Sequence, residues 1–292
     1  MNFRAVVRAE SLFQAVWACI FASAGLLPQI LEAATPPKHV IARLWSYSFS
    51  QSTLVEARYV VDLASATAAP EARPPSDYRT LRVERKRADV EAFDRLEKRI
   101  QEAGATDLDD DLAVAIKKIE KAKSWGHSPG DQLLASPDGN RAVLSPDFGE
   151  PIVVDLRTLH TQRLVNRSDP LPIPMAWSPD SNLIAFAPSE AGTIVLYDIG
   201  RRAIQSTISS QGAWVIAMEW SPDMQELALI NLVNRRLHKT PKGLLESFSG
   251  HPDYRNDLVL QLLVIASQER HSVQLKSNLT EQSSYDYWIE WQ

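Results

Sequence analysis

Three stretches of the chain repeat one pattern of apolar strand, tight turn and second apolar strand. They are LLASPDGNRAVLSP (133–146), MAWSPDSNLIAFAP (175–188) and MEWSPDMQELALIN (218–231), and they align without gaps. The serines of their Ser-Pro-Asp turns lie at 136, 178 and 221, so the periods are 42 and 43 residues. Proline fixes φ and aspartate bonds back to the backbone, which makes Ser-Pro-Asp a turn signal. A period of this length predicts blade-like β-units stacked in series.

A further apolar strand follows each copy: PIVVDL (151–156), TIVLYDI (193–199) and, more weakly, NRRLHKT (234–240). One four-stranded unit cannot bury both of its faces, so such units stack radially and cover one another. The repeats resemble those of tryptophan-aspartate (WD) repeat propellers and of TolB-like bacterial propellers, in which Trp-Ser-Pro-Asp is a recurrent turn. The resemblance implies that Val154-Asp155 and Tyr197-Asp198 end third strands, at the Trp-Asp position of those families.

The predicted fold is mainly β: a small or incomplete β-propeller of about 4–5 blades with an inserted α-helical hairpin. We expect blades near 124–165, 170–210 and 213–249, a degenerate blade from 250, and another that contains strands at 38–66. Gly126-His127 and Gly250-His251 resemble the Gly-His pair that opens a WD repeat. VVDL occurs at both 60–63 and 153–156, which favours a blade for the N-terminal strands. The final SSYDYWIEWQ is expected to be a strand that closes a blade with them.

Residues 71–123 change to a helical period. Apolar residues recur at helical spacing in two pieces, with Val83, Val90, Phe93, Leu96 and Ile100 in the first and Leu108, Leu112, Ala115, Ile116 and Ile119 in the second. Gly104 separates the two pieces, and aspartates at the start of the second complement the helix dipole. The segment predicts a charged helical hairpin between N-terminal β-strands at 35–70 and propeller repeats at 124–292.

The first 34 residues have the layout of a secretory signal peptide. Arg4 and Arg8 precede an apolar run, and small residues offer cleavage after Ala24 or Ala33. The alternative is an uncleaved anchor, because residues 11–31 match the roughly 20 residues of a membrane-spanning helix. The single cysteine, Cys19, lies in this segment. We expect a periplasmic or secreted protein without disulfides, or one anchored to the membrane by this helix.

The sequence GHSPG at 126–130 matches the G-x-S-x-G nucleophile elbow of serine hydrolases, with Ser128 as the nucleophile. An elbow uses the backbone N–H after the nucleophile for its oxyanion hole, and Pro129 has no N–H. It also needs a strand before it and a helix after it, whereas here a lysine-rich helix precedes and a strand follows. We therefore predict that Ser128 is a turn residue and that the protein has no catalytic residues of this class.

Asp107, Asp109 and Asp111 resemble the start of a calcium loop. Such a loop needs glycine at its sixth position and glutamate at its twelfth, where this chain has Leu112 and Lys118. The aspartates are better explained as residues at a helix start. The six histidines show no zinc-ligand spacing, so we predict no metal site and no cofactor.

A net charge of −5 and the lack of a basic stripe with interleaved aromatic residues argue against a nucleic-acid partner. We expect an exported, non-enzymatic β-propeller that serves as a protein–protein interaction platform at the bacterial cell envelope. Partner contacts are expected first on the hairpin at 78–123 and at the repeat turns; the membrane is expected as a partner only through an uncleaved N-terminal segment. One alternative is a propeller enzyme, a hydrolase or lyase with a site in the central channel. Another is a degenerate propeller without independent function.

Overall fold

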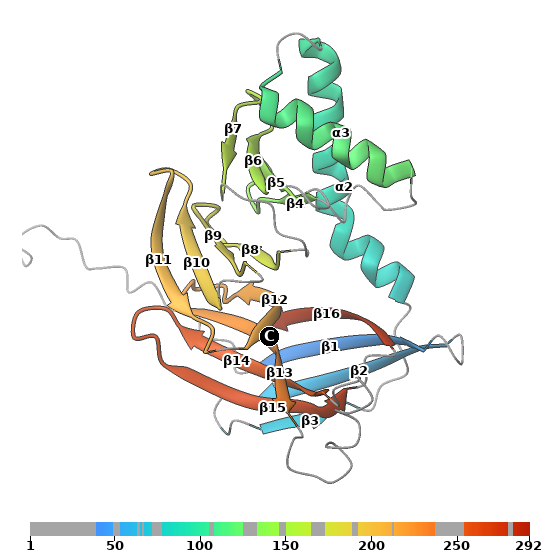
Figure 1. The fold of residues 1–292 in the computed structure, drawn as a ribbon, viewed down its shortest axis with the longest axis vertical. Coiled ribbons are helices and arrows are strands. Elements are labelled where there is room, and N and C mark those ends of the chain that lie inside the picture. The colour runs from blue at the N-terminus through green and yellow to red at the C-terminus, as the bar shows by residue number, and fades with distance from the viewer. Residues whose placement is uncertain are drawn as a thin grey trace, which may run out of the picture. The chain divides into compact units, whose positions relative to one another are not determined.

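The described strands form four four-stranded antiparallel sheets, which we call blades 1–4, and two helices stand between the third and fourth strands of the chain (Figure 1). The computed structural model describes residues 39–48, 53–62, 65, 67–71, 78–104, 108–124, 133–145, 150–164, 173–188, 192–211, 213–236, 254–279 and 283–292. The fold is mainly β with an inserted helical pair, and the predicted fold class is confirmed.

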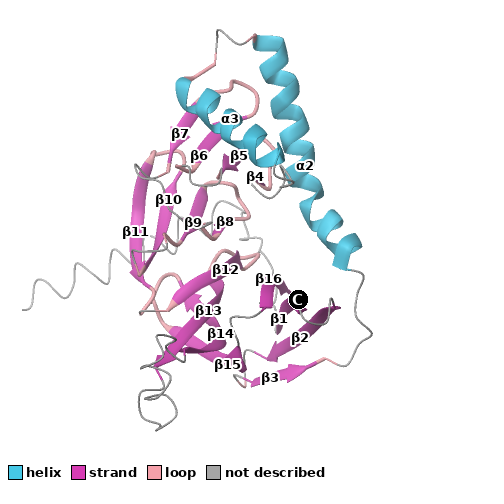
Figure 2. Cartoon of the chain, turned by 45° about the vertical axis from the view of Figure 1, so that its right-hand side comes forward, coloured by secondary structure: helices cyan, strands magenta, loops and turns pink. Residues whose placement is uncertain are grey.

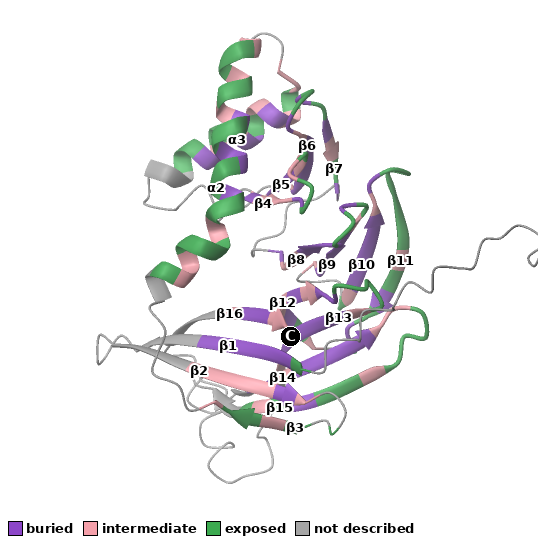
Figure 3. Ribbon diagram, turned by 180° about the vertical axis from the view of Figure 1, so that it is seen from behind, coloured by how far each residue is buried: buried purple, intermediate pink, exposed green. Residues whose placement is uncertain are grey.

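Blades 1 and 2 are meanders of short strands. Blade 1 contains β4 (Leu133–Ala135), β5 (Arg141–Leu144), β6 (Ile152–Asp155) and β7 (Thr161–Arg163). Blade 2 contains β8 (Met175–Trp177), β9 (Leu183–Phe186), β10 (Thr193–Asp198) and β11 (Ala203–Ser209). In each blade a Ser-Pro-Asp turn joins the first two strands, and Val154-Asp155 and Tyr197-Asp198 end the third strands. Figure 3 shows that the middle strands are buried, whereas the edge strand β11 is largely exposed.

Blade 3 has longer strands and includes residues that the sequence pattern assigns to a separate blade. Its strands are β12 (Trp214–Trp220), β13 (Glu226–Arg236), β14 (Tyr254–Val264) and β15 (Arg270–Leu279). β13 and β14 pair from Glu226 opposite Val264 to Arg236 opposite Tyr254. The prediction of a degenerate blade from residue 250 is therefore wrong, as is a third strand at 234–240, because β13 continues to Arg236. The apolar pattern of Tyr254–Val264 predicts a strand but does not show that this strand pairs with β13.

Blade 4 combines the two ends of the described chain, as predicted. Its strands are β16 (Ser283–Trp291), β1 (His39–Ser48), β2 (Thr53–Asp62) and β3 (Thr67–Pro70), hydrogen-bonded in that order. The VVD sequence at 60–62 ends the third strand of this blade, just as VVD at 153–155 ends the third strand of blade 1. The N-terminal strands therefore belong to a blade, as the shared VVDL had predicted.

The register of blade 4 shows which residues correspond to the Ser-Pro-Asp hairpins. Gln292 and His39 exchange backbone hydrogen bonds of 3.0 and 3.4 Å. In blade 3 the Ser221 N–H bonds to the Glu226 carbonyl at 2.9 Å in the corresponding place. Gln292 thus occupies the serine position, and Trp291 occupies the position of the tryptophan that precedes Ser-Pro-Asp in blades 2 and 3.

The apolar core lies between consecutive blades. One buried cluster joins blades 1 and 2, a second joins blades 2 and 3, and a third joins blades 3 and 4. Tryptophan side chains add a repeated hydrogen bond across these interfaces. The indole of Trp177 donates to the carbonyl of Leu134 at 3.1 Å, and that of Trp220 donates to the carbonyl of Ala176 at 3.2 Å. Each bond fixes the first strand of one blade to the first strand of the blade before it.

Helices α2 (Tyr78–Ala103) and α3 (Asp110–Ser124) form the predicted helical hairpin (Figure 2). Their buried side chains form one cluster with blade 1; the helical members are Ala92, Phe93, Leu96, Leu112, Ala115 and Ile119. Gly104 ends α2 with φ +79°, and its N–H donates to the Ile100 carbonyl at 3.1 Å. This left-handed conformation is one that glycine adopts readily.

Two apolar positions of the first helix do not face the core. Val83 and Val90 are 66% and 44% exposed, whereas Asp89 and Ala92 are buried. The buried face of α2 follows Asp89, Ala92 and Leu96, and the two valines lie off this face. The helical spacing of Val83 and Val90 therefore predicts the helix correctly but does not define the face that it buries.

Candidate interaction site

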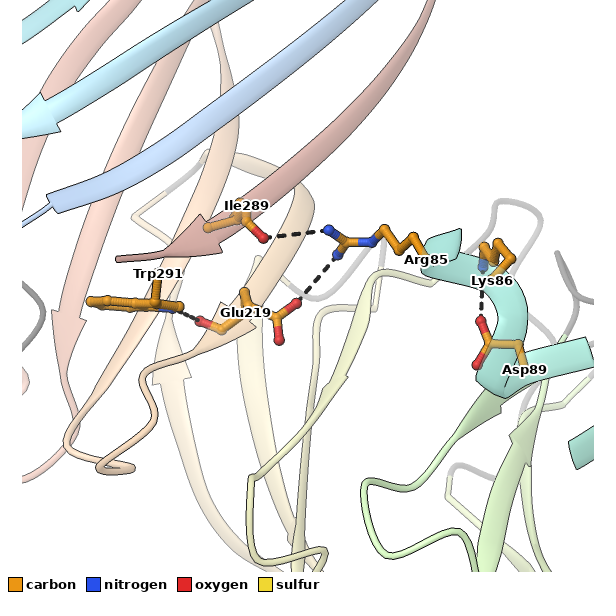
Figure 4. A network of polar contacts seen from close by, with 6 residues as sticks. All are labelled: Arg85, Lys86, Asp89, Glu219, Ile289 and Trp291. Carbon is orange, nitrogen blue, oxygen red and sulfur yellow. Dashed lines mark hydrogen bonds and ion pairs between the residues drawn. The ribbon is translucent and has the colours of Figure 1, made fainter. Parts of the chain in front are cut away.

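Arg85 joins the N-terminal part of α2 to the first strands of blades 3 and 4. Its guanidinium donates hydrogen bonds to the Ile289 carbonyl in β16 at 3.4 Å and to Glu219 Oε2 in β12 at 3.3 Å (Figure 4). The guanidinium carbon also lies 5.3 Å from the centroid of the Trp288 ring. A single cation therefore contacts an aromatic ring, a carboxylate and a backbone carbonyl, which are the groups that favour a guanidinium.

The alternation of the strands places Glu219 and Trp288 beside this cation. Met218 and Trp220 belong to the core between blades 2 and 3, so Glu219, between them in β12, points to the other side of the strand. Ile289 likewise belongs to the core between blades 3 and 4, so Trp288 points away from that core. Glu219 and Trp288 are thus held in place because the residues next to them in sequence belong to buried clusters.

The Arg85–Glu219 pair lies at the edge of the protein. The surrounding strands remove water from the Glu219 carboxylate and raise its pKa, and the charge of Arg85 opposes this rise. The two side chains nevertheless retain 36% and 38% of their accessible surface. Exposed ion pairs of this kind contribute about 1 kcal/mol or less to stability. The Arg85–Glu219 contact therefore has a specific geometry but contributes little to the stability of the fold.

The next turn of α2 is attached to blade 1 instead. Asp89 is 6% exposed, accepts a hydrogen bond from the Ala135 N–H at 2.8 Å and lies 3.3 Å from Lys86 Nζ. Burial raises the pKa of Asp89, and the Lys86 charge and the Ala135 hydrogen bond oppose that rise. Ala135 holds in β4 the position that Trp177 holds in β8. The helix therefore contacts blade 1 at the position where blades 2–4 carry a tryptophan.

A second carboxylate occupies the equivalent position in blade 4. Glu290 precedes Trp291 as Glu219 precedes Trp220, and it lies 3.1 Å from Arg43 Nη2 in β1. The Arg43 side chain is 10% exposed and the Glu290 side chain 35%. The two equivalent glutamates thus each face an arginine. Glu290 faces Arg43 of its own blade, and Glu219 faces Arg85 of α2.

The hairpin also exposes apolar side chains. Val83, Val90 and Val114 are 66%, 44% and 54% exposed, and they are three of the six large apolar side chains that are exposed in the described part of the chain. The other three are Ile204, Trp214 and Met224, on blades 2 and 3. The helices therefore bury one face against blade 1 and leave three valines exposed elsewhere on their surface.

Several residues singled out from the sequence lie outside the described part of the chain, namely Ser128, Pro129, the two Gly-His pairs and Asp107. Asp109 caps α3, because its Oδ1 accepts a hydrogen bond from the Asp111 N–H at 2.9 Å. The hydrogen bond and the charge of Arg163 lower the pKa of Asp111. Asp109 therefore serves the helix start, and Asp111 in the first turn links the helix to β7 of blade 1. No group of three or more His, Cys, Asp or Glu side chains in the described segments is placed to hold a metal ion.

Arg85, Glu219 and Trp288 were not recognised from the sequence as a site. Arg85 lies 134 positions from Glu219 and 204 from Ile289, and no local motif connects them. A partial signal was present in AMEWS (217–221) and WIEWQ (288–292), whose alignment places Glu219 and Glu290 at equivalent positions. The arginine that each glutamate faces could not be inferred from this alignment.

No protein-family model and no curated protein matches the sequence. Similar solved structures include the β-propeller domain of Cps50 (Swd1) from Myceliophteria thermophila, which is 14% identical with a TM-score of 0.30, over 50% of this chain and 55% of that one. Another is hydrazine synthase of Kuenenia stuttgartiensis, at 16% identity and a TM-score of 0.29, over 51% of this chain and 50% of that one. This chain thus spans about half the length of each. Among the described residues, no helix is long and apolar enough to span a membrane.

Proposed function

We propose that the protein is an exported, non-enzymatic propeller-type platform for protein–protein interaction at the bacterial cell envelope. The observation that carries this proposal is the exposed face of the helical hairpin, with Val83, Val90 and Val114 at its surface. Another face of the helices is already buried in the core that they share with blade 1. Contiguous exposed apolar side chains rimmed by polar residues mark interaction surfaces, and the proposal assigns these three valines to one such surface.

Site-specific photo-crosslinking in the intact cell tests this platform. A photoreactive phenylalanine analogue replaces Val83 or Val90 on α2, and a matched variant carries it at Ile204 on β11, which is 57% exposed. We expect both hairpin positions to capture the same protein and the Ile204 position not to capture it. Identical products from all three positions, or no product from the hairpin positions, would count against the platform.

Export is tested by cell fractionation and N-terminal sequencing of the full-length gene product. A cleaved signal peptide gives a periplasmic or secreted protein that begins at residue 25 or 34. An uncleaved anchor gives a membrane-bound protein that retains residues 1–34. A chain found in the cytoplasm with its N-terminus intact would contradict both forms of the proposal.

A second candidate function is a hydrolase or lyase in which Glu219 acts as the acid. The observation in its favour is that burial raises the pKa of this partly exposed carboxylate, as a general acid requires. We place it second because Glu219 contacts Arg85, a cation that opposes protonation. Turnover of chromogenic esters or glycosides by the wild type, lost in Glu219→Gln at unchanged stability, would favour the enzyme over the platform.

A further inference from the structure

We propose that Glu219, Trp288 and the Ile289 carbonyl form a binding site for a guanidinium group, which Arg85 occupies within the chain and which an arginine of a partner protein can occupy in its place. That the second occupant is a protein segment rests on the proposed platform function. The site itself rests only on the contacts around Arg85.

The groups around Arg85 match the chemistry of a guanidinium. The Trp288 ring offers a π-face at 5.3 Å, while Glu219 Oε2 and the Ile289 carbonyl accept from its two Nη atoms at 3.3 and 3.4 Å. A planar guanidinium can lie near an aromatic ring and donate two hydrogen bonds at its edge at the same time. A lysine ammonium carries the same charge but lacks this fork of donors. We therefore expect preference for arginine over lysine.

All three groups of the site lie on strands, Glu219 on β12 and Trp288 and Ile289 on β16. Ile289 is 2% exposed and belongs to the core between blades 3 and 4, which fixes β16 at this carbonyl. The carbonyl of Glu219 accepts a hydrogen bond from the Trp291 indole at 3.4 Å, which ties β12 to β16 at this point. A site preformed on rigid strands keeps its geometry when its occupant leaves.

The Arg85 guanidinium can leave the site without unpacking α2 from blade 1. Its side chain is 36% exposed, and the buried residues of α2 begin four positions later, at Asp89. The core that α2 shares with blade 1 contains Ala92, Phe93 and Leu96 and does not include Arg85. Release of the guanidinium therefore leaves the anchored part of the helix in place.

The neighbouring charges select a cation as the second occupant. Lys86 is directed at Asp89 on the blade 1 side of the helix, and Arg43 pairs with Glu290 (Figure 4 shows Lys86 and Asp89). Once Arg85 has left, the Glu219 carboxylate no longer faces the cation that it contacts here. An incoming arginine restores this ion pair, whereas an anionic group would meet a like charge.

Binding of a small arginine probe to the full chain tests the site. The probe is N-acetyl-Gly-Arg-Gly-amide, the control is the same tripeptide with neutral citrulline, and binding is followed through the indole N–H signals in NMR spectra. Arg85→Ala is expected to bind the arginine tripeptide about tenfold more tightly than the wild type, because its site no longer has an internal competitor. The citrulline tripeptide is expected not to bind, and Glu219→Gln added to Arg85→Ala is expected to abolish binding.

Three results would overturn the proposal. The first is equal binding of the arginine and citrulline tripeptides, and the second is no binding to Arg85→Ala and Arg85→Gln variants that have native near-ultraviolet circular dichroism. The third is failure of both variants to fold, because Arg85 would then be a structural residue and not a displaceable occupant. Crosslinking at Val83 does not depend on any of these results, so the site and the platform can fail separately.

Discussion

The indole nitrogen of Trp291 lies 3.4 Å from the carbonyl oxygen of Glu219, across 72 positions of sequence. Trp220 has the same relationship with Ala176 in the preceding blade, at 3.2 Å, and Trp177 repeats it once more. The first strand of each of blades 2–4 is thus fixed to the first strand of its predecessor by one indole. This repeated bond explains why tryptophan stands before Ser-Pro-Asp, and why blade 4 keeps the tryptophan although glutamine follows it.

Replacement of Trp220 tests the contribution of this bond. Trp220 is 3% exposed, so Trp220→Phe removes the indole donor to the Ala176 carbonyl and opens a small cavity. We expect the free energy of unfolding to fall by about 2–3 kcal/mol, measured by urea titration. Trp214→Phe, at a residue that is 45% exposed, is the matched control and should change it by less than about 0.5 kcal/mol. Equal losses in the two variants would show that the indole bond is not the cause.

The repeat could be predicted because its signals are local, and the errors concern strands that pair over long distances. Ser-Pro-Asp carries its own turn chemistry, so three copies sufficed to place the first and second strands of blades 1–3. The strand from Tyr254 to Val264 pairs with β13, from which residues 237–253 separate it in sequence. Its own sequence does not indicate which strand it pairs with. An apolar strand can complete one blade or open another, and only the tertiary pairing decides between them.

Asp180 is expected to make the stability of the protein depend on acidic pH. Partial burial opposes its ionisation, but hydrogen bonds from Ser178 and Asn182 prevail and hold its pKa below the usual 3.8. Ionised Asp180 therefore favours the folded chain. The stabilisation is complete above the pKa of the unfolded chain and is lost as the pH falls through the lower folded pKa.

The measurement is the urea midpoint between about pH 5 and about pH 2.5, in the wild type and in Asp180→Asn. The wild-type midpoint should fall more steeply with acidification, because the variant has no carboxylate to protonate at this turn. Asp94→Asn, on the exposed side of α2, serves as the control and should follow the wild-type curve. Parallel curves for the wild type and Asp180→Asn would refute the assignment.

The face by which α2 packs on blade 1 can be tested with two truncations. Leu96 is fully buried in the shared core, so Leu96→Ala should lower the free energy of unfolding by about 3 kcal/mol. Val90→Ala, at a residue that is 44% exposed, should change it by about 0.5 kcal/mol or less. A large loss in Val90→Ala would instead place Val90 in the interface with blade 1. Thermal or urea unfolding of the full chain measures both.

The sequence predicts only part of the candidate site, namely the equivalence of its glutamates and not the arginine that contacts Glu219. Glu219 and Glu290 precede aligned tryptophans, so their equivalence could be found by comparing segments. Arg85 lies on a helix where eight basic residues look alike in sequence, and only the path of α2 decides which one meets Trp288. A site made by one side chain from each of several distant elements has no linear motif.

Met224 offers a prediction about the Ser-Pro-Asp turns themselves. The residue after the aspartate adopts a left-handed conformation in all three turns, with φ of +68° at Gly139, 60° at Ser181 and 61° at Met224. A side chain at such a position costs about 1 kcal/mol relative to glycine, although glycine loses more chain entropy on folding. We expect Met224→Gly to stabilise the protein by about 0.5 kcal/mol, measured as a higher urea midpoint. Ser181→Gly should not, because it removes the hydroxyl that accepts the Asp138 N–H hydrogen bond at 3.0 Å and links blades 1 and 2. Stabilisation by both substitutions would mean that this link between blades contributes less than the relief of backbone strain.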